Sequence, residues 1–204
     1  MNSRSLPKVA RLLNSKVGTI ELPPTILMTD DLRGPNPIQS IKKLDPKCGI
    51  VFRHYNTKSR FKLGLKVKRV CQKKKILFIV AGSYSLACKL DADGLHLPEY
   101  KLLACPLKVR MWSRRPNKIL TASAHSHSTL MKCRDLPVDA VMVSPVFKTE
   151  SHPNQEALGI SRFQKLASST PTPIYALGGI NNANAAQLLN SPAIGIAGIS
   201  AISE

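Results

Sequence analysis

The amino-acid sequence predicts an α/β fold, a (β/α)8 TIM barrel, and two observations support this prediction. Eight short runs rich in Val, Ile and Leu recur along the 204 residues, without the strict alternation of strands that have one face in water. Segments with helical spacing separate most of these runs. Strands that are covered on both faces and joined by helices form a doubly wound sheet or a barrel, and eight strands favour the barrel.

The predicted strands are short and spread along the chain. They span residues 25–29, 49–55, 76–82, 93–97, 119–125, 140–147, 173–179 and 195–202. Apolar residues with helical spacing predict one helix within 38–44 and another within 163–167. Residues 181–190 predict a third helix, with Asn181 or Asn182 placed to cap it.

The barrel domain is predicted to occupy residues 23–204, and the sequence ends directly after the eighth predicted strand. The final helix, which would cover strands eight and one, is therefore expected to be absent, and something else must cover that apolar face. A basic N-terminal extension, residues 1–22, is one candidate. Its apolar residues include Leu6, Val9, Leu12 and Leu13. The alternatives are a second subunit, which would make the protein a homo-oligomer, and truncation of the chain.

Cysteine usage and hydropathy indicate a cytoplasmic protein. The five cysteines are far apart and include no Cys-x-x-Cys pair, which argues for reduced thiols and against a disulfide framework or a zinc site. No apolar run is long enough to cross a bilayer, so we expect no membrane partner. The first 20 residues are basic and lack acids, a composition typical of an organelle transit peptide and equally of a basic tail.

The formal net charge of +18 predicts a surface that attracts polyanions or phosphorylated metabolites. The densest basic segment is 58–75, with nine basic residues and no acid. Its regularly placed apolar residues indicate a solvated helix face, and it has no interleaved aromatic residues of the kind that stack on bases. We therefore do not expect nucleic acid to be the main partner.

Polar residues follow most of the predicted strands, and in a parallel barrel the carboxyl ends of the strands carry the active site. Arg53 and His54 end the second strand, where two polar groups closing a buried strand need a ligand or partners. Pairing of Arg53 with Asp30 or Asp31 is the simpler explanation. The complete set of candidate site residues is Arg53, His54, His125, Lys148, Thr149, Ser151, His152, Gly178, Gly179, Ser200 and Ala201.

The most specific of these segments is ALGGINNANA, residues 176–185, in which a strand leads through Gly178 and Gly179 into a predicted helix. Backbone amides can approach a ligand closely where no Cβ intervenes, and a helix N-terminus favours negative charge. Together with Ser200 and Ala201 after the eighth strand, this turn predicts a phosphate site. A tight turn that needs glycine only for packing is the alternative.

Five motifs in this part of the chain resemble successive signatures of the thiamine phosphate synthase/TenI family. They are DGLHLPE (93–99), SAHS (123–126), VMVSPVFKTESHP (141–153) followed by ALGI (157–160), IYALGGI (174–180) and GIAGISAI (195–202). The resemblance implies a (β/α)8 barrel and one of two reactions. Synthases of this family join a pyrimidine pyrophosphate to a thiazole phosphate and release pyrophosphate, whereas TenI-type members aromatise a thiazole phosphate tautomer by proton transfer.

The resemblance also implies roles for individual residues. The thiazole phosphate would lie on Gly179, Ser200 and Ala201, and Thr149 and Ser151 would face the same ligand. His152 stands where the synthases carry a lysine. His125, in SAHS, is the proton carrier that the TenI-type reaction implies, and imidazole suits proton transfer near neutral pH. His96 and His127 are interpreted as structural or merely polar residues.

Three further positions, at the implied metal site, depart from the synthase pattern. Ala81 and Gly82 stand where synthases place an Asn-Asp pair that serves the pyrophosphate and its magnesium, and a second metal-binding acid falls near Lys101. Magnesium needs oxygen ligands, which Ala and Gly side chains lack. We therefore predict no metal site and no cofactor, with Mg²⁺ required only by a working synthase. Without it, Arg53, Lys148 and His152 would have to neutralise the pyrophosphate.

These departures favour a protein of thiamine biosynthesis that binds a thiazole phosphate and performs tautomerase-type proton transfer. The first alternative is a synthase with a rearranged pyrophosphate site. The second is a non-catalytic member that binds a phosphorylated ligand or a polyanion.

Overall fold

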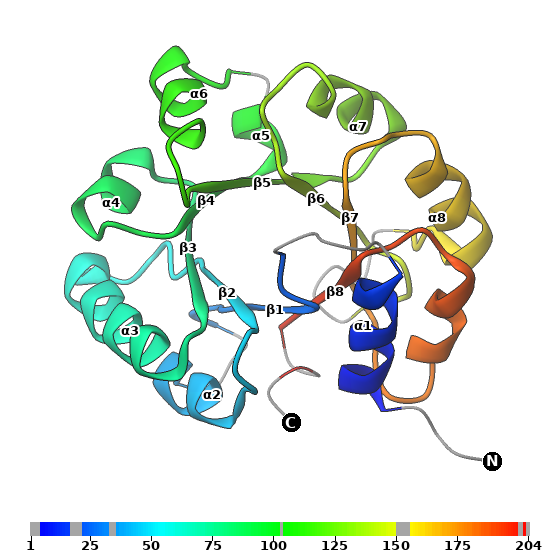
Figure 1. Cartoon of the computed structure of the whole chain (residues 1–204), viewed down its shortest axis with the longest axis horizontal. Coiled ribbons are helices and arrows are strands. Elements are labelled where there is room, and N and C mark those ends of the chain that lie inside the picture. The colour runs from blue at the N-terminus through cyan, green and yellow to red at the C-terminus, as the bar shows by residue number, and fades with distance from the viewer. Residues whose placement is uncertain are drawn as a thin grey trace.

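The computed structural model describes residues 5–16, 22–32, 36–102, 104–149, 156–199 and 202, and its strands form a closed parallel barrel (Figure 1). The strands are β1 (Thr25–Met28), β2 (Gly49–Phe52), β3 (Leu77–Ala81), β4 (Gly94–Leu97), β5 (Ile119–Ala124), β6 (Ala140–Val143), β7 (Ile174–Leu177) and β8 (Gly195–Gly198). Each strand pairs with its neighbour in sequence, and β8 pairs with β1. The predicted (β/α)8 barrel is confirmed.

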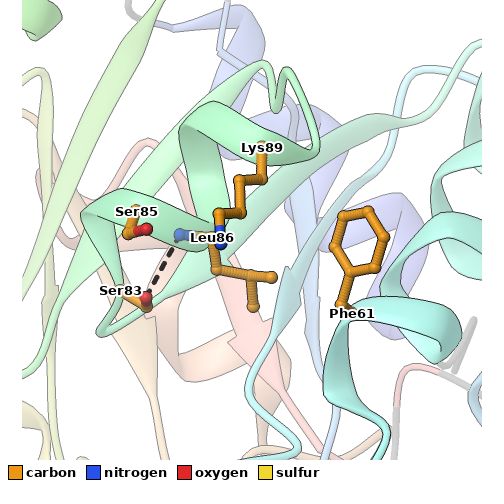
Figure 2. A pocket seen from close by; sticks show the side chains of 5 residues that line it. All are labelled: Phe61, Ser83, Ser85, Leu86 and Lys89. Carbon is orange, nitrogen blue, oxygen red and sulfur yellow. Dashed lines mark hydrogen bonds between the residues drawn. The ribbon is translucent and has the colours of Figure 1, made fainter.

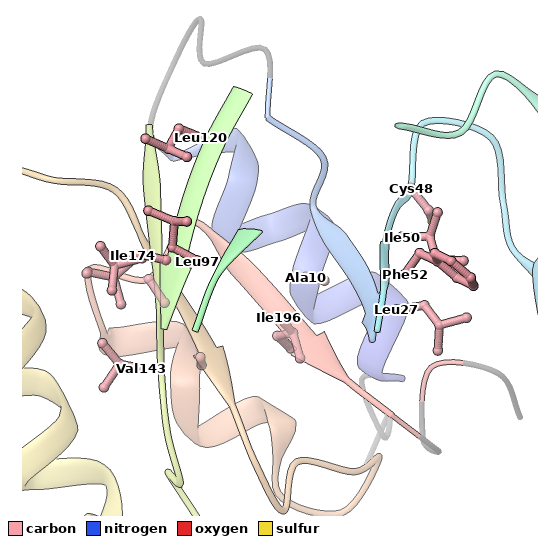
Figure 3. Close-up of a cluster of buried hydrophobic side chains, with 14 of the residues drawn as sticks. Ala10, Leu27, Cys48, Ile50, Phe52, Leu97, Leu120, Val143, Ile174 and Ile196 are labelled. Carbon is pink, nitrogen blue, oxygen red and sulfur yellow. The ribbon is translucent and has the colours of Figure 1, made fainter. Parts of the chain in front are cut away.

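The strands are buried on both faces, which explains why their sequences do not alternate. Along β2, Ile50 and Phe52 belong to an outer cluster that includes the buried residues of the helices, whereas Val51 belongs to an inner cluster drawn almost entirely from strand residues. Figure 3 shows side chains of the outer cluster, among them Ala10 and Ile196. The inner cluster fills the barrel, so the barrel is a packed core and not a pore.

Helices surround the barrel between successive strands (Figure 1). They are α1 (Leu6–Ser15), α2 (Pro37–Lys43), α3 (Arg60–Lys74), α4 (Tyr84–Lys89), α5 (Glu99–Leu102), α6 (Leu107–Ser113), α7 (His127–Cys133), α8 (Gly159–Ser168) and the 3₁₀ helix η1 (Ala185–Asn190). The helices predicted within 38–44 and 163–167 correspond to α2 and α8.

The helix predicted at 181–190 is the part of the element pattern that was wrong. Its first four residues form a turn, because the Asn181 side chain accepts hydrogen bonds from the amides of Ala183 (2.9 Å) and Asn184 (3.2 Å). The Asn182 side chain accepts instead from the amide of Leu6, at 2.8 Å, and caps nothing in its own segment. Only 185–190 become helical, and they form a 3₁₀ helix.

Helix α1 covers the apolar face beside β8 that the sequence left open. Leu6, Val9 and Leu13 are buried in the outer cluster, whereas Leu12 is 36% exposed. The helix contacts η1, β8 and β1, and the side-chain amide of Asn14 donates to the carbonyl of Ile194 at 3.1 Å. In Figure 1, α1 accordingly lies beside β8, where a helix following β8 would pack.

All five cysteines are free thiols, and Cys48, Cys71 and Cys133 are buried. Burial raises the pKa of the Cys71 thiol to about 12, so this side chain is an inert part of the core. Within the described ranges, no helix combines the length and the hydropathy that crossing a bilayer requires.

Candidate functional site

The carboxyl ends of the strands meet at one rim of the barrel and bring most of the predicted site residues to the same side. Arg53 and His54 follow β2, His125 follows β5, Lys148 and Thr149 follow β6, and Gly178 and Gly179 follow β7. Four further predicted residues, Ser151, His152, Ser200 and Ala201, lie outside the described residues.

Arg53 is neutralised by Asp30, which is the simpler of the two explanations that its sequence position allowed. A guanidinium nitrogen, Nη2, forms a salt bridge with the Asp30 carboxylate, and Nε donates to the carbonyl of Thr29 at 2.8 Å. The two paired side chains are only 20% and 18% exposed. Much of the positive charge of Arg53 is therefore already balanced within the protein.

His54 is buried beside this pair. Its Nδ1 lies 2.8 Å from the Thr29 hydroxyl, and its ring stacks on Phe52 with 5.2 Å between the ring centres. Burial is the main reason that the pKa of His54 is lowered, despite the opposing effect of Asp31 and Asp30. Because the ring is then neutral near pH 7, it can meet a ligand as a hydrogen-bonding group but not as a cation.

His96 lies inside the barrel on β4, with both ring nitrogens occupied. Nδ1 is 2.9 Å from the Thr121 hydroxyl and Nε2 is 2.9 Å from the Ser123 hydroxyl. Burial, together with the charges of Arg53 and His125, lowers the pKa of His96 to about 3. The ring is a neutral core group, which agrees with its structural interpretation.

His125 is held at one ring nitrogen and has a carboxylate near the other. Nδ1 lies 3.0 Å from the carbonyl oxygen of Ser144, and Nε2 lies 3.8 Å from a carboxylate oxygen of Glu99. Because a carbonyl can only accept, Nδ1 carries the hydrogen, and Nε2 is left as a base. Glu99 also accepts from the Thr129 hydroxyl, which fixes it where it can stabilise a protonated ring.

The sequence interpretation did not assign site roles to Glu99 and Ser144. Glu99 begins α5 and Ser144 directly follows β6, so both stand at strand ends like the residues that were chosen. The sequence signal that could have identified Glu99 and Ser144 is a polar residue at the end of an apolar run. His127, by contrast, is the first residue of α7 and is exposed, consistent with a merely polar role.

The Gly178–Gly179 turn is tightly packed against the segment that follows β6. Both glycines have positive φ, and a Cβ on Gly179 would lie 2.3 Å from the carbonyl oxygen of Lys148. The Phe147 amide donates to the carbonyl of Gly178 at 3.0 Å, and the Asn184 side chain donates to that of Gly179 at 2.8 Å. Packing alone therefore requires glycine here, and the helix start expected at this turn is absent.

Two cations lie at the end of β3, where the family resemblance implies an Asn-Asp pair. Arg60 Nη2 donates to the carbonyl of Ala81 at 2.7 Å, and Lys101 Nζ donates to the carbonyl of Gly82 at 2.6 Å. The guanidinium of Arg60 lies over the ring of Tyr55, 5.0 Å from its centre. Sequence reasoning missed both cations, because Arg60 belongs to a basic run that was interpreted as a solvated helix face.

These residues do not fit a magnesium ion. Ala81 and Gly82 offer only main-chain carbonyls, and both already accept hydrogen bonds from cations. In the described part of the chain, no group of three or more His, Cys, Asp and Glu side chains is arranged to hold a metal. Magnesium requires a nearly octahedral set of oxygen ligands, which these residues do not provide.

A groove lies outside the barrel between α3 and α4 (Figure 2). It is lined by Phe61, Ser83, Ser85, Leu86 and Lys89. The Ser83 hydroxyl caps α4 by accepting from the amide of Leu86 at 3.2 Å, so this serine has a structural role. None of the predicted site residues lines the groove.

Comparison with known proteins agrees with the resemblance seen in the sequence. The family model for thiamine monophosphate synthase matches residues 45–202. The "Putative thiamine-phosphate synthase 2" of Aquifex aeolicus is 31% identical, over 89% of this chain and 98% of the relative. The thiamine-phosphate synthase of Coprothermobacter proteolyticus is 34% identical, over 70% of this chain and 66% of the relative.

Solved structures give the same fold. The thiamine phosphate pyrophosphorylase from Pyrococcus furiosus superimposes with a TM-score of 0.68 and 23% sequence identity, and the superposition covers 94% of this chain and 92% of the other. At this level of identity the match supports the barrel alone.

Proposed function

Because the chain belongs to the thiamine monophosphate synthase family, we propose that it joins a pyrimidine pyrophosphate to a thiazole phosphate and releases pyrophosphate. The observation that carries this proposal is the alignment over 98% of a relative named as a putative thiamine-phosphate synthase. The sequence interpretation favoured tautomerase-type proton transfer, with the synthase reaction as the first alternative. The names of the relatives support the alternative better.

The rim divides into two halves that suit the two substrates. On the side of β6 to β8, the thiazole phosphate is proposed to lie over the Gly178–Gly179 turn, beside Lys148 and Thr149 and the undescribed Ser200 and Ala201. Lys148 is exposed and can reach a phosphate as a mobile point charge. The pyrimidine pyrophosphate is then assigned to the side of β2 to β4.

The reaction displaces pyrophosphate from the pyrimidine-bearing carbon as a new bond forms to the thiazole. The protein must hold two phosphorylated molecules in line and neutralise the charge that develops on the leaving group. Positioning and electrostatic stabilisation are tasks for a rigid rim with fixed cations, and no side chain needs to form a bond to either substrate.

Purified protein incubated with both substrates tests this proposal. Thiamine phosphate and pyrophosphate should appear in equal amounts, measured by chromatography and by a coupled phosphate assay. Absence of both products, with thiazole phosphate still raising the melting temperature, would reject the synthase and favour the non-catalytic binder.

A second candidate function, thiazole tautomerisation by proton transfer, is favoured by the geometry of His125. Its Nε2 is the open base, and Glu99 lies 3.8 Å away to stabilise the protonated ring. General acid–base catalysis of this kind contributes roughly 10²–10⁴ to a rate.

His125→Ala separates the two functions. In a tautomerase, the variant should lose about 10²–10⁴ of the rate with the thiazole carboxylate phosphate tautomer. In a synthase, the variant should retain most of its rate of pyrophosphate release, since that reaction needs no proton carrier. A variant that converts the tautomer as fast as the wild type would remove His125 as a catalytic residue.

A further inference from the structure

The rim above β3 carries two cations that form no ion pair with a carboxylate of the described residues. Neither Arg60 nor Lys101 takes part in the ion pairs of the described residues, whereas Arg53, which follows the neighbouring strand β2, is paired with Asp30. Both unpaired cations donate to main-chain carbonyls one residue apart, those of Ala81 and Gly82. Two positive charges therefore lie at the end of β3, Arg60 on the side of β2 and Lys101 on the side of β4.

Arg60 is held rigidly. It is the first residue of α3, its guanidinium lies 5.6 Å from the ring centre of Phe52 and 5.0 Å from that of Tyr55, and Nη2 also donates to the carbonyl of Phe52 at 3.2 Å. Its Nε is buried and has no hydrogen-bond partner. Asp31 is close enough for its charge to act on Arg60, but the two form no direct ion pair among the described residues. A partly buried cation without a direct ion pair is costly, which makes the position favourable for an anion.

Hydrogen-bond donors remain available on both side chains. A guanidinium has five N–H donors and an ammonium three. Arg60 uses only Nη2 for the carbonyls of Phe52 and Ala81, and Lys101 makes one bond, to the carbonyl of Gly82. The Nη1 group of Arg60 and two hydrogens of Lys101 can therefore bind oxygen atoms of an anion without breaking the contacts that position them.

We infer that Arg60 and Lys101 form a metal-independent site for a diphosphate group at the carboxyl end of β3. The inference rests on the proposed function, because only the synthase reaction has a pyrophosphate to hold. Resemblance to the family places acidic metal ligands near these positions, and here neutral residues and a lysine replace them. The fixed cations supply directly the positive charge that a carboxylate-bound magnesium would otherwise bring.

Gly82 and Tyr55 complete the site. Gly82 has a φ of +69°, and a Cβ there would meet the Tyr55 ring at 3.0 Å. A side chain at this position, such as a metal-binding aspartate, would push on the ring that covers Arg60. The position of the Tyr55 ring is therefore compatible with glycine at position 82 and not with an aspartate.

Titration calorimetry with inorganic pyrophosphate, in EDTA and in Mg²⁺, tests the inference. The wild-type protein should bind pyrophosphate in EDTA, and Mg²⁺ should not tighten the binding. Lys101→Met should weaken binding by about tenfold or more, because it removes a charge-assisted hydrogen bond. Arg60→Lys, which keeps the charge but loses the Nη1 donors, should also weaken it. Lys101 is exposed, so its variant is expected to melt at the wild-type temperature.

Lys165→Met is the matched control. Lys165 is exposed on α8, across the barrel from α3 (Figure 1), and its removal changes the net charge equally. A distant surface charge is screened, so binding should change by less than about twofold. Binding that requires Mg²⁺, equal losses in the Lys101 and Lys165 variants, or no binding at all would each overturn the inference.

The experiments distinguish an error in the proposed diphosphate site from an error in the proposed synthase function. Formation of thiamine phosphate by the Lys101→Met protein at the wild-type rate, with unchanged pyrophosphate affinity, would remove the site and leave the synthase in place. Pyrophosphate binding of the expected kind without any product from the two substrates would keep the site and reject the synthase.

Discussion

The two halves of the barrel rim are built in different ways. On the side of β6 to β8, the main chain itself forms the surface, and the Gly178–Gly179 turn packs directly on the carbonyls of Phe147 and Lys148. On the side of β2 to β4, side chains form the surface, with Arg60 and Lys101 anchored on main-chain carbonyls. The main-chain half matches the family motifs, and the side-chain half departs from the synthase pattern at the end of β3. A surface made of main chain tolerates little change, whereas one made of side chains can exchange one source of positive charge for another.

The largest effect is expected from Gly179→Ala, which tests the rigidity of the main-chain half. The new Cβ would lie 2.3 Å from the Lys148 carbonyl oxygen, and the φ of +67° disfavours any side chain. Left-handed backbone and overpacking together should lower the free energy of unfolding by about 2–5 kcal/mol, measured by urea titration. Gly159→Ala is the control, because Gly159 has a φ of +69° but nothing within 4 Å. Equal losses in the two variants would show that the close packing contributes nothing.

The next effect concerns His96, which lies on β4 between the two halves. The pKa of His96 is about 3 in the folded protein, below the ordinary value near 6.5. Between these two pH values the unfolded chain binds a proton at His96 and the folded protein does not. Stability is therefore lost as pH falls below about 6.5 toward 3, by about 2 kcal/mol between pH 8 and pH 5.

His96→Gln tests this origin of the pH dependence. The variant should be less stable at pH 8 but should lose less free energy of unfolding on acidification than the wild type. The burial-lowered pKa of His54 adds a loss in the same direction in both proteins, so it cancels in the comparison. Identical pH profiles would contradict the assignment to His96.

The smallest effect is expected from Gly82→Ala, in the side-chain half. Gly82 has nearly the same φ as Gly179, +69°, but its new Cβ would meet only the Tyr55 ring, at 3.0 Å. The exposed ring can move, so the loss should be close to the backbone cost alone, about 1–2 kcal/mol by urea titration. If Gly82→Ala lowers the free energy of unfolding as much as Gly179→Ala, the two halves of the rim do not differ in rigidity.

The barrel was predictable because its signal is local and repeated. Eight apolar runs mark strands that are buried on both faces, and each is bounded by residues that favour turns or helix starts. The five family motifs then placed His125 and the Gly178–Gly179 turn at the correct strand ends. Local patterns such as these need no knowledge of distant contacts.

The remaining features depend on partners that are distant in sequence. The Asn182 side chain accepts from the amide of Leu6, and no pattern within 181–190 could reveal this partner. Arg60 and Lys101 act through the carbonyls of Ala81 and Gly82, and a main-chain carbonyl leaves no mark in the sequence. The sequence indicated that Arg53 could pair with Asp30 or Asp31, and the structure shows the salt bridge with Asp30.

The central claim is that this rim supports the synthase reaction with side-chain cations at β3. Its most direct test is the rate of pyrophosphate release from the two substrates in EDTA, compared between the wild type and Lys101→Met. The expected result is release by the wild type without Mg²⁺ and a rate at least about tenfold lower in the variant. Release that appears only after Mg²⁺ is added, at the same rate in both proteins, would contradict the claim.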